Sequence, residues 1–180
     1  MAANCVRFRA MIPALTILGL DPGLRHTGWG IVAQDGNRLS FIAAGRISPD
    51  SVLPMASRLC VLAEGLADVL ARYTPSEAAI EETFVNKNAA SALKLGQARG
   101  VCMLTLAQGG LAVNEYAANR IKQSVTGYGL ADKAQIQAMV AMLLPGASDL
   151  VTDAADALAV AITHAHHRPA AALMARRVGA

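Results

Sequence analysis

Short apolar runs separated by turn residues occupy the first part of the sequence and predict three consecutive β-strands. The runs cover residues 17–20, 29–34 and 39–44. The last two are joined by Asp35, Gly36 and Asn37, which is a strong hairpin signal because glycine and asparagine accept the positive φ angles of tight turns. We therefore expect an antiparallel meander at the start of the fold.

From residue 55 onward the apolar positions recur at helical spacing. Leu59, Leu62, Leu66 and Val69 lie on one side of a helix expected over residues 55–72. Short buried strands are expected within residues 77–83 and 111–116, and further helices within residues 89–107, 118–125, 132–144 and 149–166. Three strands followed by strand–helix alternation predict an α/β fold, with a five-stranded mixed sheet flanked by helices on both faces.

The length of 180 residues is typical of one domain. We expect residues 15–167 to form it, with a poorly ordered extension at 1–14 and a tail at 168–180. The hydrophobic content of 54% and the mean hydropathy of +0.37 owe much to alanine, and no apolar run approaches the roughly 18–20 residues of a membrane span. Three cysteines with no pairing or metal spacing favour a reducing cytoplasm.

Four carboxylates stand at the edges of apolar segments. Asp21 and Glu81 end predicted buried strands, and Asp153 and Asp156 open the alanine-rich final helix. Desolvating a lone carboxylate is costly, and the sequence offers no well-placed basic residue beside these acids. Parallel neighbouring strands would place Asp21 and Glu81 together at the carboxyl edge of the sheet, and the spacing of three puts the other two on one side of their helix. If the four converge, a divalent metal is their natural partner.

Such a site would take Mg²⁺ or Mn²⁺, because carboxylates are hard oxygen ligands and no Cys or His constellation supports zinc. Two such ions about 3.5–4 Å apart can activate a water and stabilise the leaving oxygen in phosphodiester cleavage. Each acid also has a purely structural explanation: Asp21 as a turn former, Glu81 as a strand end facing water, and Asp153 and Asp156 as first-turn acids facing the helix dipole. Convergence in space would decide between the two interpretations.

Basic residues are concentrated between residues 84 and 133. Six bases minus two acids, Glu115 and Asp132, give this window +4, against +3 for the whole chain. The six bases are Lys87, Lys94, Arg99, Arg120, Lys122 and Lys133. A positive surface of this kind can hold phosphates, although charge alone describes a solvated face equally well.

The segment ILGLDPGLRHTGWG at residues 17–30 resembles the opening motif of the RuvC family, the bacterial Holliday junction resolvases. Residues 79–88 are similar to the second acidic motif of that family, and residues 91–101 match its characteristic helix. Shorter matches at residues 115–118, 121–123 and 154–164 continue the resemblance in order. It extends from about Leu15 to His167.

The resemblance implies an RNase H-like fold, a homodimer and Mg²⁺-dependent cutting of four-way DNA junctions, with Mn²⁺ as a substitute and two ions at each active site. It implies paired nicks with 5′-phosphate and 3′-hydroxyl ends, and it implies the branch-migration proteins RuvA and RuvB as partners. The metal-binding catalytic acids that it implies are Asp21, Glu81, Asp153 and Asp156. The implied DNA-binding positions are Phe84, Lys87, Lys122 and Lys133.

These positions have structural explanations as well. Phe84 would pack under the next helix in the absence of DNA stacking, and the lysines would then be solvated side chains. On the helix at residues 89–107, a stripe of Leu93, Gly96, Gly100 and Leu104 fits either ordinary core or a surface against which a twin helix packs.

Three other functions fit parts of the pattern. Asp-x-Gly followed by Thr27 and Gly28 also occurs in the phosphate loops of actin-like ATPases and sugar kinases, but those proteins need two domains and a second glycine-rich loop. A junction-binding module without catalysis would keep the fold and the charge, and the intact set of four acids argues against it. Another RNase H-like nuclease, such as a YqgF-type protein, would differ in its preference among junction, duplex and RNA–DNA hybrid.

Overall fold

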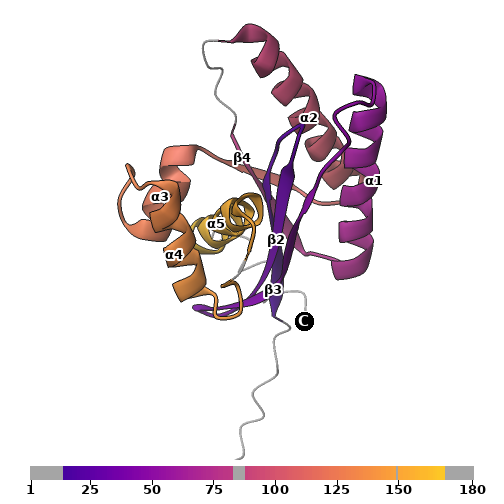
Figure 1. Ribbon diagram of the computed structural model, residues 1–180. Coiled ribbons are helices and arrows are strands. Elements are labelled where there is room, and N and C mark those ends of the chain that lie inside the picture. The colour runs from indigo at the N-terminus through magenta and orange to yellow at the C-terminus, as the bar shows by residue number, and fades with distance from the viewer. Residues whose placement is uncertain (1–13, 83–87, 149, 169–180) are drawn as a thin grey trace, which may run out of the picture.

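The computed structural model describes residues 14–82, 88–148 and 150–168 (Figure 1). Every predicted strand and helix is present in the predicted order, with bounds that differ by a few residues. The strands are β1 (Leu15–Asp21), β2 (Thr27–Asp35), β3 (Arg38–Ile47), β4 (Glu77–Glu81) and β5 (Val113–Tyr116). The helices are α1 (Met55–Tyr73), α2 (Ala89–Gln108), α3 (Ala118–Thr126), α4 (Lys133–Leu143) and α5 (Thr152–His167). The predicted start of the last helix, at residue 149, lies outside the described residues.

The five strands form one mixed sheet in the order β3-β2-β1-β4-β5. β1, β2 and β3 pair antiparallel, and β4 and β5 join in parallel on the other side of β1. In the hairpin, Asp35 pairs with Arg38, and Gly36 has a φ of 60°, which suits glycine in a tight turn. The predicted meander and the predicted mixed sheet are confirmed.

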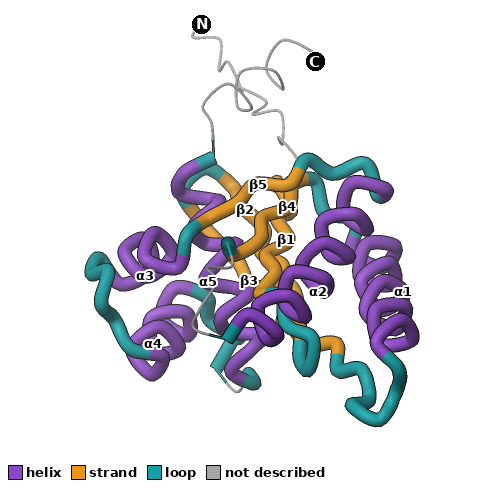
Figure 2. The backbone as a smooth tube through the Cα atoms, turned by 90° about the horizontal axis from the view of Figure 1, so that it is seen from above, coloured by secondary structure: helices purple, strands orange, loops and turns teal. Residues whose placement is uncertain are grey.

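Helices cover both faces of the sheet, as the sequence predicts. α1 and α2 lie on one face, and α3, α4 and α5 lie on the other (Figure 1 and Figure 2). Strand alternation divides the apolar side chains between two cores: Ile17 and Ala79 face α5, whereas Leu18 and Ile80 face α1 and α2. Among the described residues, no helix has the length and apolar character to cross a membrane.

The central helix α5 approaches the sheet closely because small residues meet on both sides of the contact. All α5 residues from Ala154 to Ala165 are buried except Asp156, and many of them are alanines. Gly28 of β2 lies beneath the start of α5 and pairs with Asp21 at the end of β1. A Cβ at Gly28 would stand 1.9 Å from the carbonyl oxygen of Asp153. The glycine therefore lets α5 bring its two acids against the end of β1.

Gly28→Ala is expected to lower the free energy of unfolding by roughly 1–3 kcal/mol, because the added methyl group pushes the first turn of α5 off the sheet. The midpoint of urea unfolding measures the change. Gly129→Ala is the control, since the nearest atom to its added Cβ lies 3.9 Å away and its midpoint should stay close to that of the wild type. Equal midpoints for the two variants would show that the close approach of α5 is dispensable.

A buried polar network ties the last turn of α5 to the sheet. The side chain of His164 is 1% exposed, with Nε2 2.9 Å from Glu77 Oε2 and Nδ1 2.9 Å from the Tyr116 hydroxyl. Arg168 donates to both oxygens of Glu77, from Nε at 3.0 Å and from Nη2. Since a carboxylate only accepts, the proton of the neutral imidazole is on Nε2, and Tyr116 donates to Nδ1. His164 is therefore fully enclosed, although it stands in the last turn of its helix.

This network makes stability depend on pH. Burial lowers the pKa of His164 even though Glu77 opposes the shift. Burial alone would raise the pKa of Glu77, but hydrogen bonds from Arg168 and His164 lower it from its ordinary 4.5. Below about pH 6.5 the unfolded chain therefore binds a histidine proton that the folded chain does not bind. The contribution of Glu77 is present above its unfolded pKa and is lost as the pH falls through the folded pKa.

The free energy of unfolding should consequently fall on acidification below about pH 6.5, by up to about 1.4 kcal/mol per pH unit for the His164 proton. Urea unfolding across this pH range measures the slope. His164→Gln should flatten it, because the amide does not titrate, whereas His26→Gln at an exposed position should preserve it. A wild-type slope in His164→Gln would remove His164 from the explanation.

Candidate active site

Two strand-end carboxylates lie side by side at the carboxyl edge of the parallel part of the sheet. Asp21 is the last residue of β1, and Glu81 is the last residue of β4. The residues before them, Leu20 and Ile80, pair across the two strands. Because side chains alternate along a strand, both acids face α5. The adjacency predicted for them is confirmed.

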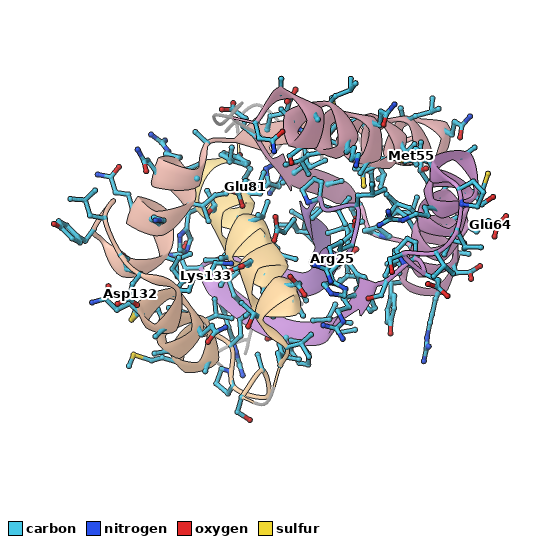
Figure 3. The ribbon with its side chains drawn as sticks, turned by 45° about the horizontal axis from the view of Figure 1, so that its top comes forward. Arg25, Met55, Glu64, Glu81, Asp132 and Lys133 are labelled. Carbon is cyan, nitrogen blue, oxygen red and sulfur yellow. The ribbon has the colours of Figure 1, made fainter. Side chains whose placement is uncertain are left out.

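Asp156 of α5 reaches the same edge. Together with Asp21 and Glu81 it lines a cavity of about 200 Å³, which Lys122 and Lys133 also line. In Figure 3, Glu81 and Lys133 both lie close to α5. Residues far apart in the sequence thus converge on one small cavity at the edge of the sheet.

Burial and mutual repulsion raise the pKa of two of these acids. For Asp21, burial is the largest cause, and Glu81 and Asp156 add to it, which brings the pKa to about 7. Burial and the charge of Asp156 also raise the pKa of Glu81. Neighbouring carboxylates shift one another in this way only when they are a few ångströms apart. The electrostatics therefore support convergence rather than three unrelated surface acids.

Lys133 supplies a positive charge beside the acids. Its Nζ lies 3.1 Å from Asp156 Oδ2, and the hydrogen bond and charge of Asp156 raise the pKa of Lys133. Asp132 caps α4 and forms a capping box with Gln135, which fixes the first turn that carries Lys133. The expectation that no well-placed basic residue accompanies the acids is therefore wrong. Lys133 and Asp156 are 23 residues apart and meet only in the folded chain.

Asp153 lies beside this cavity instead of lining it. It is one helical turn before Asp156 and lines a neighbouring hollow, where its Oδ2 is 3.6 Å from Arg46 Nη1. Burial is the main cause of the raised pKa of Asp21. Of the three acids whose charges raise this pKa further, Asp153 has the smallest effect. Arg46, on β3, was not among the predicted site residues. No local motif marks it, because it reaches Asp153 through the pairing of β3 with Gly28 of β2.

The donor atoms at this edge suit a hard divalent cation. The acidic groups that converge here offer only carboxylate oxygens, the ligands that Mg²⁺ and Mn²⁺ prefer. The raised pKa of Asp21 shows that additional positive charge would be favourable at this position. Within the described part of the chain, no three His, Cys, Asp or Glu side chains are spaced to hold one ion together. Lys133 and Arg46 instead pair with Asp156 and Asp153.

The predicted DNA-binding positions are only partly described by the structure. Lys122 lies on α3, which buries Ile121 and Val125, and its side chain lines the cavity of the acids. Phe84 and Lys87 lie outside the described residues. In the rest of the basic window, Arg99 pairs with Glu115. Within this window, the basic side chains that line the cavity of the acids are Lys122 and Lys133.

The loop between β1 and β2 is closed by Thr27. Its buried hydroxyl donates to the carbonyl oxygen of Gly23 at 2.6 Å and accepts from the Gly23 amide at 3.2 Å. The threonine that suggested a phosphate loop of the actin-like type is thus occupied in holding its own turn. This arrangement fixes the chain directly after Asp21.

The sheet order and the acids at the ends of β1 and β4 and on α5 define an RNase H-like fold. The model of the family Crossover junction endodeoxyribonuclease RuvC matches residues 17–164. This chain belongs to the RuvC family.

Similar proteins agree with this assignment. Crossover junction endodeoxyribonuclease RuvC of Rhodopseudomonas palustris strain BisB18 is 59% identical over 166 residues, which are 92% of this chain and 95% of the relative. The protein of the same name from Azorhizobium caulinodans is 60% identical over 159 residues, 88% of this chain and 94% of the relative. The structure of Thermus thermophilus RuvC in complex with Holliday junction substrate has a TM-score of 0.78 and 30% identity, covering 84% of this chain and 93% of that one. The yeast mitochondrial Holliday junction resolvase, at 12% identity and a TM-score of 0.63, shares the fold alone.

Proposed function

We propose that this chain is a structure-selective endonuclease that resolves four-way DNA junctions in recombination and repair. The observation that carries the proposal is the cavity in which Asp21, Glu81 and Asp156 converge beside Lys122 and Lys133. Acids and bases at one edge serve two purposes, since the acids suit a metal and the bases suit the phosphate to be cut. Membership of the RuvC family supports the choice of a junction as the substrate.

In this proposal Asp21, Glu81 and Asp156 hold Mg²⁺, with Mn²⁺ as a substitute, and Asp153 completes the set from the adjacent turn of α5. When bound, two such ions would activate a water and stabilise the leaving oxygen, giving nicks with 5′-phosphate and 3′-hydroxyl ends. The β1 and β4 ends keep two carboxylates in fixed register, and the close approach of α5 holds the third against them. Preorganised ligands of this kind need little rearrangement at the moment of reaction.

The basic side chains position the DNA. Lys133 contacts Asp156 at 3.1 Å, and we propose that it turns to a phosphate once the acid holds a metal. Lys122 lines the same cavity. Phe84 and Lys87 follow Glu81 in the sequence, and we propose that Phe84 stacks on an unpaired base at the junction while Lys87 contacts the backbone. Base–aromatic stacking of this kind contributes about 1–3 kcal/mol.

We further propose that the protein acts as a homodimer in the cytoplasm, together with the branch-migration proteins RuvA and RuvB. A symmetric dimer places two identical active sites on two symmetry-related strands, which is what an even cut of a junction needs. Residues 15–167 would be the nuclease domain, with extensions at 1–14 and 168–180. Within the second of these, Arg168 is packed against Glu77 of β4.

The test is cleavage by the purified protein of three substrates of matched sequence: a four-way junction, a duplex and an RNA–DNA hybrid. With Mg²⁺ we expect paired, ligatable nicks in the junction and little cutting of the other two, and EDTA should abolish the cutting. A preference for the hybrid would identify another RNase H-like nuclease. Tight junction binding without cleavage would identify a binding module, and ATP hydrolysis lost in Asp21→Asn would revive the ATPase alternative.

A further inference from the structure

A second hollow of about 470 Å³ lies next to the cavity of the acids, on the other side of the first turn of α5. Four segments surround it: the loop after Asp21, the beginning of α1, the first turns of α2 and the first turn of α5. Its charged and titratable lining residues are Arg25, His26, Arg58, Lys94 and Asp153. Asp153 connects the two sites, because it lies at this hollow and one helical turn from Asp156.

The hollow carries an excess of positive charge that the described part of the chain does not neutralise. Among the described residues, Arg25, Arg58 and Lys94 have no ion-pair partner, and Asp153 is already paired with Arg46. Cations gathered in a concave site attract an anion from solution more strongly than the same charges on an open surface. The lining of the hollow therefore favours a negatively charged ligand.

Arg58 is held in place by the fold, and Arg25 and Lys94 remain accessible. Arg58 Nη2 donates to the carbonyl oxygen of Leu24 at 2.8 Å, which ties α1 to the loop, and Arg58 Nε has no hydrogen-bond partner among the described residues. Arg25 and Lys94 are exposed, so their charged ends can meet a ligand without any rearrangement of the core. Asn88 caps α2 by accepting from the Ser91 amide, which fixes the helical turn that carries Lys94.

The position of the hollow indicates which anion it binds. In Figure 3, Arg25 lies on the α1 and α2 side of α5, whereas Lys133 lies on the opposite side. A DNA strand that crosses the acids would therefore meet Lys122 and Lys133 on one side and Arg25 and Lys94 on the other. The phosphodiester backbone presents negative charges at regular spacing, so one strand can occupy both sites at once.

We infer that Arg25, Arg58 and Lys94 form a second phosphate-binding subsite, which holds the DNA backbone beside the cleavage position. The inference rests on the proposed function and adds positioning residues to it. Arg58 fixes the shape of the subsite through Leu24, and Arg25 and Lys94 supply the exposed charges that contact phosphate. The DNA strand would then be held at one point on each side of the acids, and these two points would fix the direction of the scissile strand.

The test uses the double variant Arg25→Gln/Lys94→Gln and measures binding of a labelled four-way junction in EDTA, where no cutting occurs. Losing two phosphate contacts should reduce the magnitude of the slope of log K against log salt by about 2 and weaken binding by roughly 30-fold at about 0.15 M salt. Arg38→Gln/Arg72→Gln is the matched control, because it removes the same charge from exposed positions that line neither site. The inference is overturned if the two double variants have the same slope.

A second measurement distinguishes contact from a general charge effect. Single methylphosphonate substitutions remove the charge of one phosphate at a time near the cut, and we expect one or two of them to weaken binding by the wild-type chain. At those positions the variant Arg25→Gln/Lys94→Gln should no longer respond, and a full response in the variant would also overturn the inference. Both measurements require only DNA binding. If the wild-type chain binds junctions without cutting them, the proposed function is refuted, but the phosphate-binding subsite can still be tested.

Discussion

The variant Asp156→Asn is expected to cut four-way junctions about a thousandfold more slowly than the wild-type chain. A metal ion at a phosphoryl group contributes several kcal/mol of transition-state stabilisation, and about 4 kcal/mol corresponds to a factor of a thousand in rate. Asp156 lines the cavity together with Asp21 and Glu81, so its loss removes a charged oxygen from the proposed metal site. The asparagine has nearly the same shape, and the fold should be preserved.

Junction binding should survive this change. The substitution removes a negative charge beside the DNA and frees Lys133 from its contact of 3.1 Å with the carboxylate. Affinity measured in EDTA should therefore equal or exceed that of the wild type, while single-turnover cleavage with Mg²⁺ falls. Asp68→Asn, at an exposed position of α1, is the matched control and should cut normally. Normal cutting by Asp156→Asn would mean that this acid serves only the first turns of its helix.

The sheet and half of the acid cluster were predictable because they depend on local patterns. A strand that ends at a carboxylate is visible in the sequence, and parallel pairing then brings two such ends together, as for Asp21 and Glu81. The hairpin at Gly36 followed from turn chemistry alone. Asp156 required one further step, namely that the last helix crosses this edge of the sheet.

The partners of the acids were not predictable, because they come from elements that approach only in three dimensions. Lys133 opens α4 and Arg46 lies on β3, and each reaches an acid on α5. Asp153 pairs with that arginine and lines the neighbouring hollow, and helical spacing does not predict this placement. The close approach of α5 over Gly28 was likewise hidden, since a glycine in a strand has several possible causes.

The stripe on α2 illustrates a different limit. Helical periodicity identifies the apolar sides of a helix. When a helix has two of them, periodicity does not tell which one is buried in the core. The structure shows that Ala98, Cys102 and Leu106 face the core, whereas Leu93 and Leu104 are 66% and 58% exposed. Of the two interpretations of the stripe, ordinary core is therefore wrong for the single chain. An exposed apolar stripe on a helix is suited to contact with another protein surface.

This stripe provides the dimer prediction. Leu93 and Leu104 are eleven residues apart, which is close to three helical turns, so they share one side of α2. Gly96 and Gly100 lie between them, and a Cβ at either glycine would meet no atom within 4 Å. Two copies of α2 could therefore approach closely around a twofold axis, with leucines from each copy packing against the other. We propose this surface as the interface of the homodimer.

The variant Leu93→Glu/Leu104→Glu is expected to raise the dissociation constant of the dimer by about ten-thousandfold or more. Four leucine side chains lose their burial in the dimer, at about 1.5–3 kcal/mol each, and each tenfold change in affinity corresponds to about 1.4 kcal/mol. Glutamate is a good helix former, and both positions are exposed in the single chain, so the monomer should stay folded. Sedimentation across a concentration series measures the dissociation constant.

The same variant should lose paired cutting. On a junction extruded from a supercoiled circle, two cuts within one binding event give a linear product, whereas separate cuts give a nicked circle first. Dimeric wild-type protein should yield linear product directly, and Leu93→Glu/Leu104→Glu should yield nicked circles. Val52→Glu/Met142→Glu is the control, because those side chains, in the loop before α1 and on α4, are 83% and 72% exposed and their replacement should leave both dimer and product unchanged. If the α2 variant sediments as a dimer and still gives linear product, the twofold axis must pass through another surface.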